Sequence, residues 1–263
     1  MTGTLLDEAL LEERRSTLGA STVLWAGVDG VTLGPDRWVA LSGAPSVEYN
    51  AALVHGDGDL LDQTVEEVLA MGVPTVVMVA GRAGDEVGCL RARRWISVGS
   101  TPLMHLDLRS PLAVREARDA RAGQAARRLD RHDHAAVTEL VGEVFGVGPD
   151  LARVAISGVT AGLDGEALWG AFDPAGTLVA CLATVRVGET VAVWSMATAL
   201  AARRRGYGAA ALGTALSAAA EEGATSSLLS SSAAGEPLYR ALGYRELERW
   251  YQWSRPRWVL ARR

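Results

Sequence analysis

The stretch RRRGYGAA at residues 203 to 210 places three arginines directly before two glycines and the start of an alanine run. Like charges repel one another, and each glycine lowers helix propensity by about 1 kcal/mol, so this junction is unfavourable unless an anion compensates it. Glycines let several backbone N–H groups point at one spot, and a helix that begins there directs its positive end at the same place. The stretch therefore predicts an anion-binding loop between a strand and a helix.

Two common nucleotide-binding loops do not fit this stretch. A Walker loop needs the pattern GxxxxGK[ST], and the chain contains no lysine. A Rossmann loop with the pattern GxGxxG would need glycine at position 211, where the chain has alanine. A charged cluster that only solubilises the start of a helix stays open as the alternative.

Composition restricts the class of protein. The chain has 263 residues, 49% of them apolar, which is enough for one large or two ordinary domains. Its net charge of −5 and pI of about 5.5 argue against broad binding to nucleic acid or to an anionic membrane. Cys89 and Cys181 lie far apart, with no CxxC or Cys/His spacing, so we expect no metal site and no disulfide framework. The acidic N-terminal stretch and the lack of a long apolar run predict a cytoplasmic protein.

Hydrophobic periodicity predicts two successive runs of strands and helices. The first run has strands at 37–44, 47–55, 73–81 and 96–108, with helices at 59–71 and 84–95. The second has strands at 114–120, 167–173, 177–187, 191–199, 226–232 and 244–253, with helices at 133–146, 209–223 and 236–243. The short turns DPAG and GE join three of these strands as antiparallel hairpins. An arginine- and alanine-rich stretch with proline at 111 separates the runs, which predicts domains at 1–110 and 111–263.

The second run resembles the GNAT acyltransferase superfamily. Residues 203–208 are similar to its Q/R-x-x-G-x-G/A signature, placed between a central strand and a long helix. Residues 231–246, SSAAGEPLYRALGYRE, are similar to its C-terminal segment S-x-x-G-x-x-L-Y-x-x-x-G-F, with Tyr244 in place of phenylalanine. The chain departs from the family at Leu200, where proline is common. The resemblance covers about residues 111–263 and implies an α/β (α+β) fold, with a mixed, mostly antiparallel sheet flanked by helices.

The resemblance also implies an acetyl-CoA site at the edge of the central strand and the loop after it. Backbone groups of that strand would pair with the pantetheine amides, and the N–H groups of residues 204–209 would hold the pyrophosphate. The implied cofactor-binding residues are Met196, Ala197, Thr198, Arg203, Arg204, Arg205, Gly206, Tyr207, Gly208, Ala209 and Ser232. The negative charge of coenzyme A would then explain three adjacent arginines.

The resemblance places a general acid at Tyr239, where its hydroxyl would protonate the departing CoA thiolate. An unperturbed tyrosine has a pKa of about 10 and is protonated at neutral pH. A core aromatic on an apolar helix face is the alternative reading of Tyr239. The general base is left open because strand 191–199 has no carboxylate, and Glu143, Asp164 and Glu166 are the candidates.

The expected activity is N-acetyl transfer, by direct attack, from acetyl-CoA to a primary amine of a small molecule. A non-catalytic acyl-CoA sensor and a GNAT-like acyl-CoA decarboxylase are the alternatives. Tryptophans at 169, 194, 250 and 253 are candidates for an acceptor pocket, with core packing as the default. The first domain lacks the glycine signature after a strand and is interpreted as a degenerate GNAT-like domain, with an independent regulatory ligand-binding domain as the alternative. A monomer or a homodimer is expected, with no metal, nucleic-acid or membrane partner.

Overall fold

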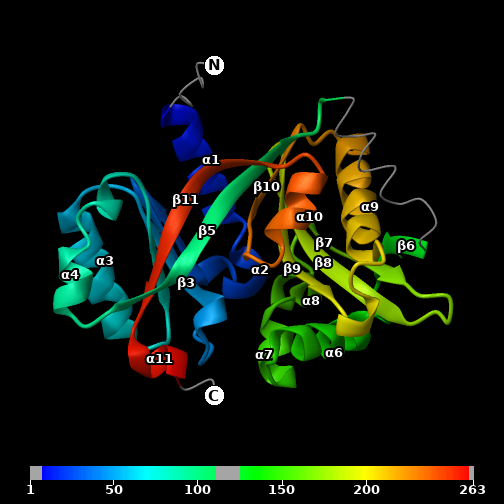
Figure 1. The fold of residues 1–263 in the computed structure, drawn as a ribbon, viewed down its shortest axis with the longest axis horizontal. Coiled ribbons are helices and arrows are strands. Elements are labelled where there is room, and N and C mark those ends of the chain that lie inside the picture. The colour runs from blue at the N-terminus through cyan, green and yellow to red at the C-terminus, as the bar shows by residue number, and fades with distance from the viewer. Residues whose placement is uncertain (1–7, 111–124, 261–263) are drawn as a thin grey trace. The chain divides into compact units, whose positions relative to one another are not determined.

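The computed structural model describes residues 8–110 and 125–260, and these fall into two compact units (Figure 1). The first unit takes the described residues up to Leu103 and from Glu246 onward, and the second takes Met104 to Arg245. This grouping differs from the predicted division at residue 110, because the last strand of the chain pairs inside the first unit. Register pairs join Tyr251 to Val79 and Trp253 to Val77.

The first unit is a sheet with helices. Its elements are α1 (Glu8–Ala20), α2 (Val23–Ala26), β1 (Val31–Gly34), β2 (Arg37–Leu41), β3 (Asn50–Val54), α3 (Gly58–Met71), β4 (Val76–Val79), α4 (Gly88–Ala92), the first part of β5 (Ile96–Asp107), β11 (Arg245–Ser254) and α11 (Pro256–Leu260). The strand order is β1-β2-β3-β4-β11-β5. Helix α3 buries Leu61, Val65 and Val68 at helical spacing and ends at Gly72, whose φ of 70° is left-handed.

The second unit is a mixed, mostly antiparallel sheet flanked by helices, as predicted. Its further elements are β6 (Ala125–Arg128), α6 (His134–Phe145), α7 (Pro149–Val154), α8 (Ser157–Ala161), β7 (Glu166–Phe172), β8 (Leu178–Val187), β9 (Thr190–Thr198), α9 (Tyr207–Glu221), β10 (Ser226–Ser230) and α10 (Glu236–Ala241). The strand order is β5-β10-β9-β8-β7-β6. Strands β6 to β9 pair antiparallel in sequence, and β9 pairs parallel with β10.

The predicted hairpins are confirmed, and local chemistry explains them. The Asp173 carboxylate accepts the N–H groups of Ala175 at 3.0 Å and Thr177 at 2.9 Å, which closes the β7–β8 turn. Gly176 and Gly188 take φ values of 81° and 56°, which other residues rarely adopt.

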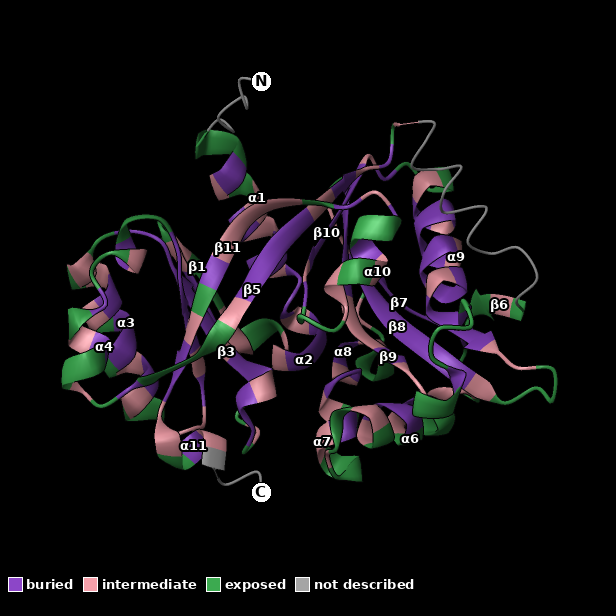
Figure 2. Cartoon of the chain, in the orientation of Figure 1, coloured by how far each residue is buried: buried purple, intermediate pink, exposed green. Residues whose placement is uncertain are grey.

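Two helices position the central strand β9 from opposite faces of the sheet. Helix α9 packs its small residues on one face, in a core cluster that includes Val191 and Val193 (Figure 2). Helix α6 packs against β8 and β9, where the alternating residue Ala192 is buried outside that cluster. Strand β9 is therefore fixed on both sides.

Helices α7 and α8 were not predicted, because residues 147–163 combine three glycines and a proline with pieces too short to show a helical period. The strand predicted at 114–120 lies outside the described residues. Within 8–110 and 125–260, no helix has the length and apolar character needed to cross a membrane.

Candidate functional site

The edge of β9 that faces β10 opens along its C-terminal half. The parallel register runs only from Ser226 opposite Thr190 to Leu228 opposite Ala192, whereas β9 continues to Thr198. Among the described residues, the backbone of β9 beyond Ala192 therefore has no recorded strand partner on that side. An extended chain with amide groups fits such an edge as an added strand would.

A bulge in β9 lies within this open part. Ser195 has a φ of 50°, and the pairing of β9 with β8 shifts register between Cys181 and Ala183. The Ser195 hydroxyl donates to the carbonyl oxygen of Ala155 at 3.0 Å. The bulge is thus tied to the loop that joins α7 and α8.

The loop after β9 delivers the start of helix α9 to the same place. Arg204 and Gly206 have φ values of 62° and 86°, so the chain turns sharply through two left-handed residues. All three arginines are exposed, and the Arg203 guanidinium donates to the Thr198 carbonyl at 3.2 Å. Gly206 is the N-cap and has no side chain to occupy the first-turn N–H groups of α9. The helix start therefore presents N–H donors and positive charge to an anion.

The two glycines are required for different reasons. Gly206 needs its positive φ, and a Cβ there would meet no atom within 4 Å. Gly208 packs against the end of β9, since a Cβ would lie 3.0 Å from Thr198 Oγ1 and 3.1 Å from Met196 Cε. Gly206 shapes the loop, whereas Gly208 lets helix and strand approach closely.

Tyr239 joins this junction from helix α10. Its hydroxyl donates to the Met196 sulfur at 3.3 Å, and burial raises its pKa to about 12. The ring packs edge-on against Tyr244, with centroids 5.7 Å apart. Tyr244 in turn shares a 2.6 Å hydrogen bond with Ser227. The phenol is therefore held firmly and stays protonated throughout the physiological range.

The structure brings four predicted residues together, namely Met196, Thr198, Gly208 and Tyr239. The side chains of Ala197 and Tyr207 are buried, so only their backbone can face a ligand. Ser232 is exposed, and its hydroxyl accepts the N–H of Gly235 at 3.2 Å, which gives it a local turn role. The contact between Met196 and Tyr239 was not predicted, because a thioether in a strand gives no sequence signal.

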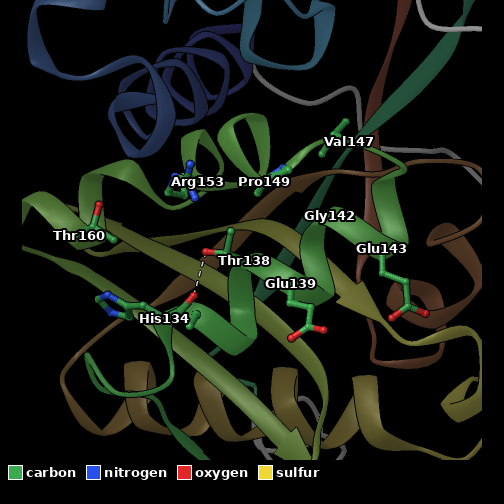
Figure 3. Close-up of a pocket in the computed structure, with 10 residues that line it drawn as sticks. His134, Thr138, Glu139, Gly142, Glu143, Val147, Pro149, Arg153 and Thr160 are labelled. Atoms are coloured by element: carbon green, nitrogen blue, oxygen red, sulfur yellow. Dashed lines mark hydrogen bonds between the residues drawn. The ribbon is translucent and has the colours of Figure 1, made fainter.

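A cavity of about 710 Å³ lies among α6, α7 and α8 (Figure 3). It is lined by His134, Ala135, Thr138, Glu139, Gly142, Glu143, Val147, Pro149, Arg153 and Thr160. Of the three candidate bases, Glu143 lines this cavity and Asp164 is exposed. Glu166 is buried, and both its oxygens lack a partner among the described residues.

Three of the four tryptophans are packed in the core, as the default reading expects. Trp169 is buried in the α9 core and donates to Thr184 Oγ1 at 2.9 Å. Trp250 and Trp253 are buried in the first unit, and Trp194 is half-buried. None of the four is among the residues that line the described cavity.

In the first unit, Glu12, Asp36 and His55 bring their ligand atoms within 4.8 Å of one another. Their geometry does not suit a metal ion. The Glu12 carboxylate lies 3.1 Å from Nε2 of His55, whereas Asp36 lies 3.7 Å from Nδ1, so the two acids approach different ring nitrogens. The buried Arg15 guanidinium, 3.2 Å from His55 Nδ1, adds a positive charge at the same place. Burial lowers the pKa of His55 to about 4, so the cluster is better described as a neutral histidine beside the ion pairs of Arg15 with Glu8, Glu12 and Glu248.

The first unit also has a strand–helix junction, between β3 and α3, but it is closed. Strands β3 and β4 stay paired up to the last residue of each, where Val54 lies opposite Val79. Beyond that pair, the Ala80 N–H still donates to the Val54 carbonyl at 3.0 Å. At the start of α3, the carboxylate of Asp57 accepts the N–H of Leu60 at 3.0 Å. A second carboxylate, that of Glu86, accepts the N–H of Gly58 at 2.7 Å. The chain's own acids thus occupy this helix start.

Comparison with known proteins agrees with the geometry of the second unit. Residues 149–244 match the family model described as "Acetyltransferase (GNAT) family". Residues 149–244 form a GNAT domain. This domain contains the β9 bulge, the glycine loop and Tyr239. No curated protein matches the chain.

Solved structures extend the likeness of fold beyond the GNAT match. A "GCN5-related N-acetyltransferase from Kribbella flavida" is 17% identical, with a TM-score of 0.61, over 90% of this chain and 96% of that one. A GCN5-related N-acetyltransferase from Sphaerobacter thermophilus is 17% identical, with a TM-score of 0.62, over 84% and 76%. A GCN5-related N-acetyltransferase-like protein from Streptococcus suis is 14% identical, with a TM-score of 0.55, over 94% and 99%. The fold of nearly the whole chain therefore recurs in GNAT proteins.

Proposed function

We propose that this protein is an acyl-CoA-dependent N-acyltransferase that moves an acetyl group from acetyl-CoA directly to a primary amine of a small molecule. The observation that carries the proposal is the junction of β9, α9 and α10. There an open strand edge, a glycine-shaped helix start and a buried phenol converge within one GNAT domain. Each of these parts answers a different chemical need of acyl transfer.

Cofactor binding follows from the first two parts. The backbone of Met196, Ala197 and Thr198 would hold the pantetheine amides along the open edge of β9. The first-turn N–H groups of α9 and the exposed guanidinium groups of Arg203–Arg205 would hold the pyrophosphate. Each contact of an anion with a helix start contributes roughly 0.3 to 1 kcal/mol.

Transfer itself needs a neutral amine, a polarised thioester carbonyl and support for the thiolate that leaves. The Tyr239 hydroxyl lies beside Met196 and would donate to the thiolate sulfur as the C–S bond breaks. The amine proton would pass to solvent or to a carboxylate. The candidates stay Glu143, Asp164 and Glu166, although an amine does not reach the buried oxygens of Glu166 in this conformation.

The broader assignments also belong to the proposal. We expect one acetyl-CoA per chain, a monomer or homodimer, and a first unit that is a degenerate GNAT-like domain. A cytoplasmic location is supported by the two free cysteines.

The test is turnover of acetyl-CoA against a broad panel of primary amines, with mass spectrometry of the products. An acetylated amine that appears only with enzyme and acetyl-CoA supports the proposal. Release of CO2 from malonyl-CoA without amine would instead support the decarboxylase. Tight acyl-CoA binding without turnover on any amine would support the sensor.

A further inference from the structure

Glu166 is a buried carboxyl group that no residue of the described part of the chain neutralises. It is the first residue of β7, the residue is 7% exposed, and neither carboxyl oxygen has a hydrogen-bond partner among the described residues. A charge in such a place costs several kcal/mol, so a buried acid without a partner is stable mainly as the neutral form. Its surroundings therefore decide what it does.

The carboxyl group lies directly against helix α8. A Cβ at Gly158 would overlap both of its oxygens, so the absence of a side chain at 158 makes the space that the acid occupies. Helix α8 reads SGVTA and contributes no titratable group. The Glu166 carboxyl group and α8 are therefore in close contact at Gly158.

The other packed element offers no compensating charge. The residue opposite Glu166 in β8 is Val185. The next residue, Arg186, directs its Nε to the carbonyl of Gly188, and Asp164 is exposed to solvent. Burial alone raises the pKa of Glu166 to about 7.

The same short segment also holds the bulge of β9. Ala155, three residues before Gly158, accepts the Ser195 hydroxyl through its carbonyl oxygen at 3.0 Å. Ser195 is the left-handed bulge residue, and it directly precedes Met196. Residues 155–158 therefore touch Glu166 at one end and the bulge at the other.

We propose that Glu166 and residues 155–158 form a proton-dependent latch on the β9 bulge. With the acid protonated, α8 rests on β7 and Ala155 fixes Ser195. When the proton leaves to solvent, the carboxylate needs water, α8 lifts from it, and the Ala155–Ser195 bond is lost. The last step, that the bulge governs acyl-CoA binding, rests on the proposed function.

The size of the effect follows from proton linkage. Glu166 has a pKa of about 7 when α8 is closed and the ordinary 4.5 once α8 exposes it. Ionisation then raises the equilibrium constant for opening about tenfold between pH 6 and pH 8.5. No change is expected once the acid is replaced by an amide.

Hydrogen exchange of the full-length protein, corrected for the intrinsic pH dependence of exchange, tests the latch. We expect amides of residues 155–161 to lose about tenfold in protection from pH 6 to pH 8.5 in the wild type, and to lose none in Glu166→Gln. Glu221→Gln, an exposed acid at the end of α9 and outside the α6–α8 cavity, is the matched control and should behave as the wild type. Equal pH dependence in Glu166→Gln and the wild type would overturn the latch.

A second arm tests the coupling to the bulge by titration with coenzyme A at both pH values. The wild type should bind coenzyme A more weakly at pH 8.5 than at pH 6. In Ser195→Ala, hydrogen exchange should still show that α8 opens as the pH rises, but the affinity for coenzyme A should be the same at both pH values. A wild-type affinity that is the same at both pH values would overturn the coupling. If no variant binds coenzyme A at all, the proposed function fails, and the exchange data still decide the latch.

Discussion

Replacing Tyr239 by phenylalanine should lower kcat by about 10- to 150-fold and leave the KM for acetyl-CoA nearly unchanged. The change removes one hydroxyl whose present partner is the Met196 sulfur at 3.3 Å, a weak acceptor. The ring keeps its edge-on packing against Tyr244. Folding stability should therefore fall by no more than about 1 kcal/mol.

The magnitude follows from the buried state of the phenol. Its pKa of about 12 lies far above the value of about 8.5 of a free thiol, so complete proton transfer to a thiolate is uphill by about 3.5 pKa units, or about 5 kcal/mol. The hydroxyl then acts chiefly as a hydrogen-bond donor to the developing negative charge. Such a bond contributes about 1.5 to 3 kcal/mol, which corresponds to the stated range of rates.

The assay is initial rate at saturating amine with varied acetyl-CoA, beside thermal unfolding of each variant. Tyr244→Phe is the matched control, because that phenol is also buried but bonds Ser227, so the variant should lose stability without a comparable loss of kcat. A Tyr239→Phe enzyme with full kcat, or with a change confined to KM, would refute the reasoning. A fall in wild-type kcat with rising pH that begins below pH 10 and is absent in Tyr239→Phe would also refute it.

Three other perturbations follow from the same structure. Gly206→Asn should retain coenzyme A binding, because asparagine tolerates the left-handed φ of 86°, whereas Gly206→Val should weaken binding at least tenfold. Calorimetric titration measures both affinities, and equal values would show that the loop conformation is irrelevant. The same titration of the wild type should give one site per chain, and two equal sites would contradict the closed junction at α3. Glu166→Gln should raise the free energy of unfolding by about 3 kcal/mol at pH 8 and leave it unchanged at pH 4. The reason is that the pKa of Glu166 rises from 4.5 in the unfolded chain to about 7 in the folded protein, so the wild type loses stability as the pH rises from 4.5 to 7. Equal melting temperatures of the two proteins at pH 8 would remove the basis for the raised pKa.

The elements that the sequence predicted well are those fixed by local signals. Strands β7 to β9 are nearly continuous apolar runs, helices α6 and α9 bury residues at helical spacing, and glycines at turns mark where these elements end. The loop at 203–208 was also accessible, because the cost of two glycines beside three arginines is a local property. Helices α7 and α8 were not accessible, since five or six residues show no period.

Non-local pairing is the part that the sequence could not provide. The stretch 244–253 reads as a strand, but nothing in it tells that its partner is β4, more than 160 residues earlier. The contact of Tyr239 with Met196 joins residues 43 positions apart. The state of Glu166 depends on Gly158 and Val185 together, whereas its own sequence neighbours mark it only as a charged residue near a turn.

The two strand–helix junctions of this chain show how the same local geometry can lead to opposite outcomes. Both have a strand followed by a glycine-containing loop and a helix whose first N–H groups need acceptors. At α3 the acceptors are the carboxylates of Asp57 and Glu86, which neutralise the helix start from within the chain. At α9 the N-cap is Gly206, which has no side chain to act as an acceptor, and the preceding residues are arginines, so this helix start suits an anion from outside the chain. The strands differ in the same way as the helix starts, because β3 stays paired with β4 to its end while β9 separates from β10 after three residue pairs. An external anion with an extended, amide-bearing tail, as in the proposed acetyl-CoA, would therefore suit α9 and β9 at once, whereas at α3 and β3 the chain's own groups fill both places.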